Sequence, residues 1–257
     1  MSNTESECEK CNEIMAHLLE LRTRLIRCTG VFFIAFASLY VFSAKLYTTL
    51  TAPLLSKLPE DGHLIATNIA APFLAPLKLT FAVSLFITIP FILQQIWRFI
   101  APGLYDNERN LARGLLLASI GLFYVGMMFA YIIVFPLVLG FFARIVPEGV
   151  AFIPDISAYL NFALKLLFAF GIAFQVPVIT ILCIASGLVN IQSLANKRPY
   201  VIVMAFIAGM LLTPPDIVSQ LLLAIPMWLL FEGGILFARL FLRHKLDFKT
   251  NNPDLYQ

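Results

Sequence analysis

The chain has 257 residues, of which 60% are hydrophobic and 13% are charged, and its formal net charge is +3. Because so few polar residues cannot cover the surface of a water-soluble globule of this length, the composition predicts an integral membrane protein. The small net charge gives no indication of nucleic-acid binding, and the 18 Lys and Arg residues gather instead beside apolar segments.

The first segment, MSNTESECEKCN, is polar and acid-rich, and it lacks the basic and then apolar order of a cleavable signal peptide. We expect residues 1–15 to form a flexible cytoplasmic tail. Within it, Cys8 and Cys11 form a single C-x-x-C with no second pair nearby, which is a weak signal for zinc or redox chemistry. Reduced thiols in a plain tail are the simpler interpretation.

Apolar segments long enough to cross about 30 Å of hydrocarbon follow this tail. The spans that we expect are 25–44, 77–97, 115–139, 159–186, 200–212 and 217–237. The sequence therefore predicts an all-α membrane protein with about six transmembrane helices, in which the fifth is shorter than the bilayer core is thick.

The last two spans are separated only by the tetrapeptide TPPD. Pro214 and Pro215 cannot continue a helix, whereas Asp216 can cap the helix that follows. These residues predict a tight helical hairpin.

The distribution of Lys and Arg predicts the orientation. Thirteen of the 18 flank the spans on one side, whereas only Lys45, Lys57 and Arg144 lie on the other, and Lys78 and Lys165 can extend from helix ends. Both termini, including a tail at 241–257, are therefore expected in the cytoplasm. With no internal repeat, residues 1–257 are interpreted as one polytopic membrane domain.

Catalysis is not indicated. The three histidines, His17, His63 and His244, lie outside the expected spans, and no metalloprotease, serine-hydrolase or Walker motif occurs. We expect no enzyme activity, no cofactor and no metal site.

Polar residues inside the spans are functional candidates because their desolvation is costly. Gln175 precedes Pro177 and can either bond to a carbonyl that the proline leaves without a donor or face an internal groove. Glu232 can pair with Arg239, about two turns further along the same span. With Lys165, these residues leave a small-solute or ion transporter open as an alternative, and a passive membrane scaffold is a third.

Several long motifs resemble the TatC family, the multi-spanning receptor subunit of the twin-arginine protein translocase. They are AHLLELRTRL at 16–25, PFLAPLKLTF at 72–81, FIAPGLYDNER at 99–109, FGIAFQVPV at 170–178 and KRPYVIVMAFIAGMLLTPPD at 197–216. The resemblance implies a curved, glove-like bundle in the bacterial inner membrane that binds twin-arginine signal peptides and helps to export folded proteins.

The resemblance also implies the binding residues. Glu20 and Glu108 match the family's recognition acids, and a carboxylate can accept a guanidinium in bidentate fashion. Arg22 is expected to orient the acids and Phe99 to pack on the peptide. The simpler alternative is that Glu20 pairs with Arg24 at the i, i+4 spacing and that Glu108 caps or solvates a turn.

One position departs from the family pattern. Familiar bacterial relatives of this kind carry Glu where this chain has Gln175, and a neutral amide cannot transfer a proton there.

The resemblance further implies docking of single-span TatB-like and TatA-like partners, in a homo-oligomer within a hetero-complex. The expected docking edge is the last helical hairpin, with Met210, Thr213 and Gln220 near its turn. The alternative is that Gln220 bonds to a carbonyl of its own hairpin and that Thr213 bonds back to its own helix.

Overall fold

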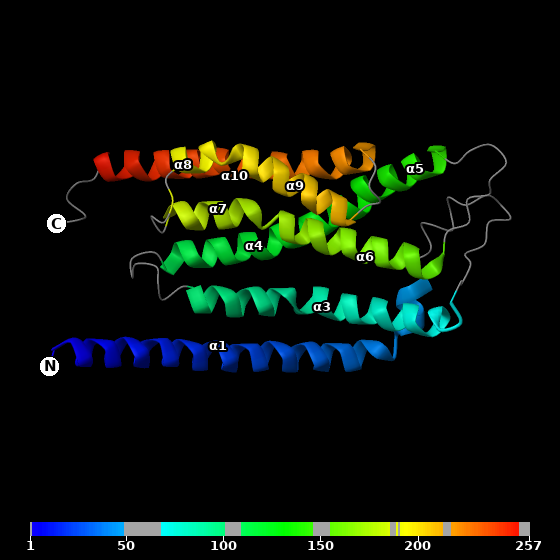
Figure 1. Ribbon diagram of the computed structural model, residues 1–257, viewed down its shortest axis with the longest axis horizontal. Helices are drawn as coiled ribbons and strands as arrows, with labels where there is room; N and C mark the ends of the chain where they lie inside the picture. Colours follow the sequence, from blue (N-terminus) through cyan, green and yellow to red (C-terminus); the bar gives the residue numbers. More distant parts are fainter. Residues whose placement is uncertain are drawn as a thin grey trace. The chain divides into compact units, whose positions relative to one another are not determined.

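The computed structural model describes residues 2–48, 68–100, 109–145, 155–185, 189, 191–212 and 217–251. The elements of these ranges are helices (Figure 1). The chain divides into two compact units, one formed by Met1–Leu116 with Asp155–Ser157 and the other by Leu117–Pro154 with Ala158–Gln257.

In the first unit, helix α1 (Ser2–Tyr40) packs along helix α3 (Ala71–Ile100), as Figure 1 shows. Aromatic rings join the two helices. The rings of Phe32 and Phe81 meet edge to face with centroids 4.8 Å apart, and Phe36 lies 6.1 Å from the same Phe81 ring. Such contacts supply dispersion energy in lipid, where the hydrophobic effect cannot hold two helices together.

Helix α1 begins at Ser2, whereas the sequence analysis expects a flexible tail over residues 1–15. The physical reason is that neither Pro nor Gly interrupts the chain before Gly30, so nothing ends the helix that continues backwards from the first span. The last helix likewise continues beyond its span, to Asn251. The single-domain organisation stays a prediction.

The second unit contains most of α4, which begins in the first unit, together with the remaining helices. Their bounds are α4 Arg109–Phe129, a π-helical turn Ala130–Val134, α5 Phe135–Ile145, α6 Ile156–Ala173, α7 Val176–Ala185, α8 Ile191–Asn196, α9 Arg198–Leu212 and α10 Ile217–Asn251. Helix α10 packs against both α9 and α7.

Prolines explain two irregularities in these helices. The Phe135 N–H donates to the Ala130 carbonyl, five residues back, just before Pro136, which has no N–H to continue the α-helical pattern. The sequence analysis missed this π-helical turn. Helix α6 ends at Ala173 and α7 begins at Val176, beside Pro177.

Among the described residues, five helices are long and apolar enough to cross a membrane, and a sixth apolar helix is shorter. The five are Leu18–Tyr40, Ala71–Phe99, Arg113–Phe142, Ile156–Ile184 and Gln220–Arg239, and the shorter one is Arg198–Leu212. The predicted all-α membrane class is thereby confirmed. The TPPD turn at residues 213–216 lies outside the described residues, and the cytoplasmic placement of the termini stays a prediction.

Two glycines allow α4 and α6 to approach closely. A Cβ atom at Gly126 would lie 2.7 Å from the Phe170 carbonyl oxygen and 2.8 Å from the Phe174 ring. A Cβ atom at Gly171 would lie 2.7 Å from the ring of Phe123. Small residues at helix contacts are a common basis of packing in membranes.

We predict that Gly126→Ala destabilises the protein by about 1–3 kcal/mol, because the added methyl group clashes with backbone that cannot rotate away. Thermal unfolding in one detergent measures the effect. Gly121→Ala is the matched control, since a Cβ atom at this position of the same helix meets nothing within 4 Å. Equal melting temperatures for the two variants would contradict the close approach.

Candidate functional site

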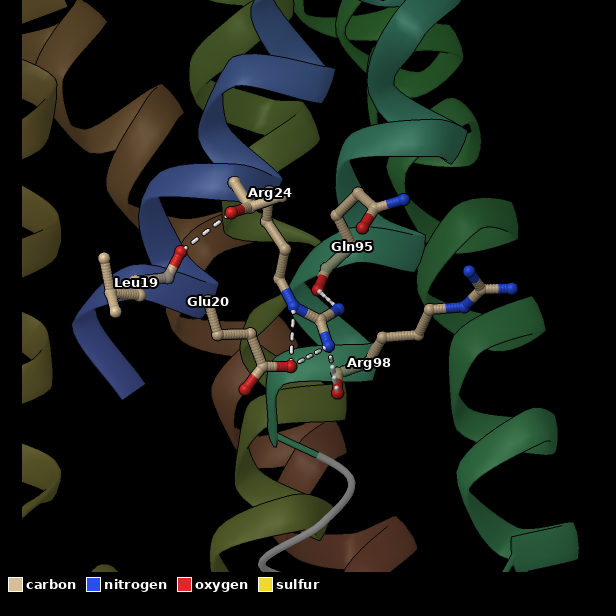
Figure 2. A network of polar contacts seen from close by, with 6 residues as sticks. Leu19, Glu20, Arg24, Gln95 and Arg98 are labelled. Carbon is tan, nitrogen blue, oxygen red and sulfur yellow. Dashed lines mark hydrogen bonds and ion pairs between the residues drawn. The ribbon is translucent and has the colours of Figure 1, made fainter. Parts of the chain in front are cut away.

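A cluster of polar contacts joins α1 to the end of α3 (Figure 2). The Arg24 guanidinium donates from Nε to Oε1 of Glu20 at 3.2 Å, and its Nη2 also bonds to that oxygen. On the other side, Nη1 donates to the Gln95 carbonyl and Nη2 to the Arg98 carbonyl, both at 3.1 Å. The ion pair between Glu20 and Arg24, the simpler alternative for this acid, is therefore present.

The cluster follows from helix geometry. Residues four apart lie one above the other on a helix, so Glu20 and Arg24 share a face of α1. Helix α3 ends at Ile100, and the carbonyl groups of its last turn, including that of Arg98, have no amide partner within the helix. Arg24 supplies a donor to this helix end, which the sequence analysis missed.

An apolar groove of about 380 Å³ runs beside the cluster, between α1 and α3. Phe99 lies in its wall together with Arg24, and the packing of Phe99 on a peptide stays a prediction. The lining residues are Leu21, Arg24, Leu25, Cys28, Thr29 and Phe32 of α1 and Leu85, Ile92, Gln95, Ile96 and Phe99 of α3.

The other predicted binding residues are placed less completely. Glu108 lies outside the described residues. Arg22 is exposed on α1, and in the structure Arg24 is the arginine that orients Glu20. The reason is helix geometry. Arg22, two positions after Glu20, points away from it, whereas Arg24, four positions after Glu20, lies on the same side of the helix. A role for Arg22, and peptide binding by Glu20, stay predictions.

Gln175 is buried and forms a reciprocal pair with Ser119 of α4. Its Nε2 donates to the Ser119 carbonyl at 2.8 Å, and the Ser119 hydroxyl donates back to its Oε1. The amide thus bonds to a carbonyl, but to one on a neighbouring helix and not to one left free by Pro177. Both ends of the amide are used inside the protein.

We predict that Gln175→Leu lowers the free energy of unfolding by about 1–3 kcal/mol, because Ser119 then keeps a buried hydroxyl without its acceptor. The double variant Ser119→Ala with Gln175→Leu should recover part of this loss, since no side-chain hydroxyl is left unpaired. Chemical or thermal unfolding of the four proteins measures the cycle. Additive losses would show that the two side chains act independently.

Glu232 is paired with Arg198, which corrects the expectation that it pairs with Arg239. Arg198 Nε lies 2.6 Å from Oε1 of Glu232, and the two atoms form an ion pair whose angles are not those of a hydrogen bond. Arg198 Nη2 donates a hydrogen bond to Oε2 of Glu232 at 2.9 Å. A pair between Glu232 and Arg239 would require their side chains to bridge two turns of α10. The contact between α9 and α10 instead brings Arg198 directly beside Glu232. A bidentate contact of this kind is the stronger one.

At the other end of this hairpin, Gln220 Nε2 donates to the Phe206 carbonyl at 2.9 Å. Gln220 therefore bonds to a carbonyl of its own hairpin, which is the alternative to partner docking given in the sequence analysis. Met210 is exposed, and Thr213 lies outside the described residues.

A second apolar groove, of about 210 Å³, lies between α9 and α10. One of its lining residues, Trp228, has a buried indole N–H with no hydrogen-bond partner within the described part of the chain. The lining residues are Ile202, Ala205, Phe206, Leu221, Ala224, Ile225 and Trp228.

These features define a polytopic helical membrane protein in which several polar side chains, among them Arg24, Gln175, Arg198 and Gln220, bond across helices. The family model for Sec-independent protein translocase protein (TatC) matches residues 16–226. TatC of Azotobacter chroococcum mcd 1 is 54% identical over 88% of each chain, and TatC of Escherichia coli K12 is 49% identical over 91% of this chain and 90% of its own.

A solved structure of the twin-arginine translocase receptor TatC has a TM-score of 0.79 and 39% identity, and the match covers 87% of this chain and 98% of that one. The chain belongs to the TatC family, which confirms the resemblance of its motifs. It is thus a multi-pass membrane component of a protein translocase, and family membership favours this role over solute transport.

Proposed function

We propose that this protein is the core receptor of the twin-arginine translocation system in a bacterial inner membrane, where it binds twin-arginine signal peptides at the cytoplasmic face. The observation that supports this most is the position of Glu20. Its carboxylate already accepts the guanidinium of Arg24, and Arg24 lines the apolar groove between α1 and α3. Family membership supplies the context, and the role needs no catalytic chemistry.

The proposed recognition uses two acids for two arginines. The Glu20 side chain is 40% exposed, so a peptide can reach it without displacing the helix. Glu108 follows the end of α3 at Ile100, in the segment that continues from the same helix. Phe99 and the groove between α1 and α3 offer apolar contact to the part of the peptide beside its arginines.

Charge-reversed variants test this proposal. A partly exposed carboxylate contact contributes about 1 kcal/mol, so Glu20→Ala or Glu108→Ala should weaken binding about fivefold. Glu20→Lys or Glu108→Lys adds repulsion and should abolish binding. Fluorescence anisotropy of a labelled twin-arginine peptide with purified protein gives the affinities, with a twin-lysine peptide for comparison.

Glu13→Lys and Asp106→Lys serve as controls, because each reverses an acid that is close in the sequence to one of the two recognition acids but is not itself one of them. Full affinity in both Glu20→Lys and Glu108→Lys, in protein that remains folded, would falsify the assignment of these acids.

The same complex is proposed to include TatB-like and TatA-like single-span partners that dock on α9 and α10. Helix α9 has 15 residues. At about 1.5 Å per residue it covers roughly 22 Å, less than the roughly 30 Å of hydrocarbon, so a covering helix would relieve mismatch. Because Gln220 already bonds to the Phe206 carbonyl, the proposed docking depends on the exposed apolar side chains of α9 and α10 and not on this amide.

Crosslinking tests this docking edge. Single cysteines replacing Met210, Thr213 or Gln220, in a variant without the native cysteines, should form disulfides with a cysteine near the outer end of a partner span. A cysteine replacing Ile34 is the control, because this residue is 73% exposed but lies on α1. Equal crosslinking at Ile34, or none at the hairpin, would reject the docking edge.

A further inference from the structure

We propose that Arg24 is the positioning residue of the binding site, holding the carboxylate of Glu20 at a fixed place relative to the end of α3. The inference rests on the proposed function, because it requires Glu20 to be a recognition acid. Peptide affinity would then depend on an arginine that acts through the carboxylate of Glu20.

The contacts of a single guanidinium support this role. All three nitrogens of Arg24 are engaged, Nε and Nη2 with Glu20 and Nη1 and Nη2 with the carbonyl oxygens of Gln95 and Arg98 (Figure 2). The side chain is only 17% exposed. Because the guanidinium is planar and its donors are fixed, holding the α3 carbonyls also fixes the direction of the donors that face Glu20.

This arrangement couples the place of Glu20 to α3, although Glu20 belongs to α1. Arg24 bonds to the Gln95 and Arg98 carbonyls of α3 and to Glu20 of α1 at the same time, so the carboxylate is held at a fixed distance from α3. Binding groups generally need support of this kind to within about 0.5 Å.

The opposite role would be competition, in which Arg24 occupies Glu20 until a peptide displaces it. The contacts with α3 favour positioning. The Gln95 and Arg98 carbonyls bond to the guanidinium independently of Glu20, so Arg24 has partners of its own that hold it in place.

Peptide affinity and peptide discrimination of the full-length protein test the proposal. We expect Arg24→Gln to weaken binding of a twin-arginine peptide about threefold, which is less than the loss expected of Glu20→Ala because Arg24 acts only through Glu20. It should also lower the preference for the twin-arginine over the twin-lysine peptide, because a misplaced carboxylate loses the geometry that matches a planar guanidinium. A general folding defect would reduce the binding-competent fraction without changing this preference. Arg24→Lys should not restore it, because an ammonium cannot reproduce the planar fork.

Two comparisons isolate the effect. Arg27→Gln removes the same charge from an exposed position of α1 and should leave the affinity within about twofold, since exposed charges contribute little. In the Glu20→Gln background, Arg24→Gln should have no further effect, because a residue that acts through Glu20 needs its carboxylate.

Each outcome decides the matter. If the wild-type protein does not prefer the twin-arginine over the twin-lysine peptide, the proposed function fails and this inference fails with it. If the preference exists and Arg24→Gln binds as tightly or more tightly, Arg24 is no positioning residue and the proposed function stands. If Arg24→Gln lowers the peptide affinity by the same factor in the Glu20→Gln background as in the wild-type protein, the inference is overturned as well. Should Arg24→Gln not fold, unchanged affinity and preference in Arg24→Lys would overturn it.

Discussion

Hydrocarbon offers no hydrogen bonds, and this constraint decides where the polar side chains of the described helices lie. Gln175 and Ser119 satisfy each other, Gln220 bonds to the Phe206 carbonyl, and Arg198 holds Glu232. Arg24 follows the same rule near a helix end, where it donates to the Gln95 carbonyl and to the Arg98 carbonyl of the last turn of α3. The contacts that stabilise the bundle and the contact that orients Glu20 thus have one physical origin.

The sequence was sufficient for features that depend on local pattern. Apolar segments predicted the six apolar helices found among the described residues, because only a helix satisfies its own backbone in lipid. The spacing of Glu20 and Arg24 likewise allowed their pair. Partners across helices could not be predicted in the same way. Glu232 had a nearby arginine in the sequence but is bonded to Arg198, because contact between α9 and α10 brings that residue closer than two turns of one helix do.

The amide at position 175 suits its surroundings for a chemical reason. Its nitrogen donates to a backbone carbonyl of α4 while its oxygen accepts from the Ser119 hydroxyl. An ionised carboxylate only accepts, so it would face that carbonyl without a donor and would carry an unpaired charge in a buried place. Gln175 therefore joins α4 to the α6–α7 break through neutral groups, and its contacts are those of a structural residue.

The position of Glu20 reflects a compromise between accessibility and strength. An ion pair in bulk water contributes little, whereas two ions deep in hydrocarbon lose more in desolvation than they gain from attraction. Glu20 lies between these limits, with its side chain 40% exposed beside an Arg24 that is 17% exposed. Under the proposed function, a second guanidinium arriving from water would meet a carboxylate whose desolvation has already been partly compensated by Arg24. The cost of ordering the acid would then be met during folding, which would leave more of the contact energy for distinguishing an arginine from a lysine.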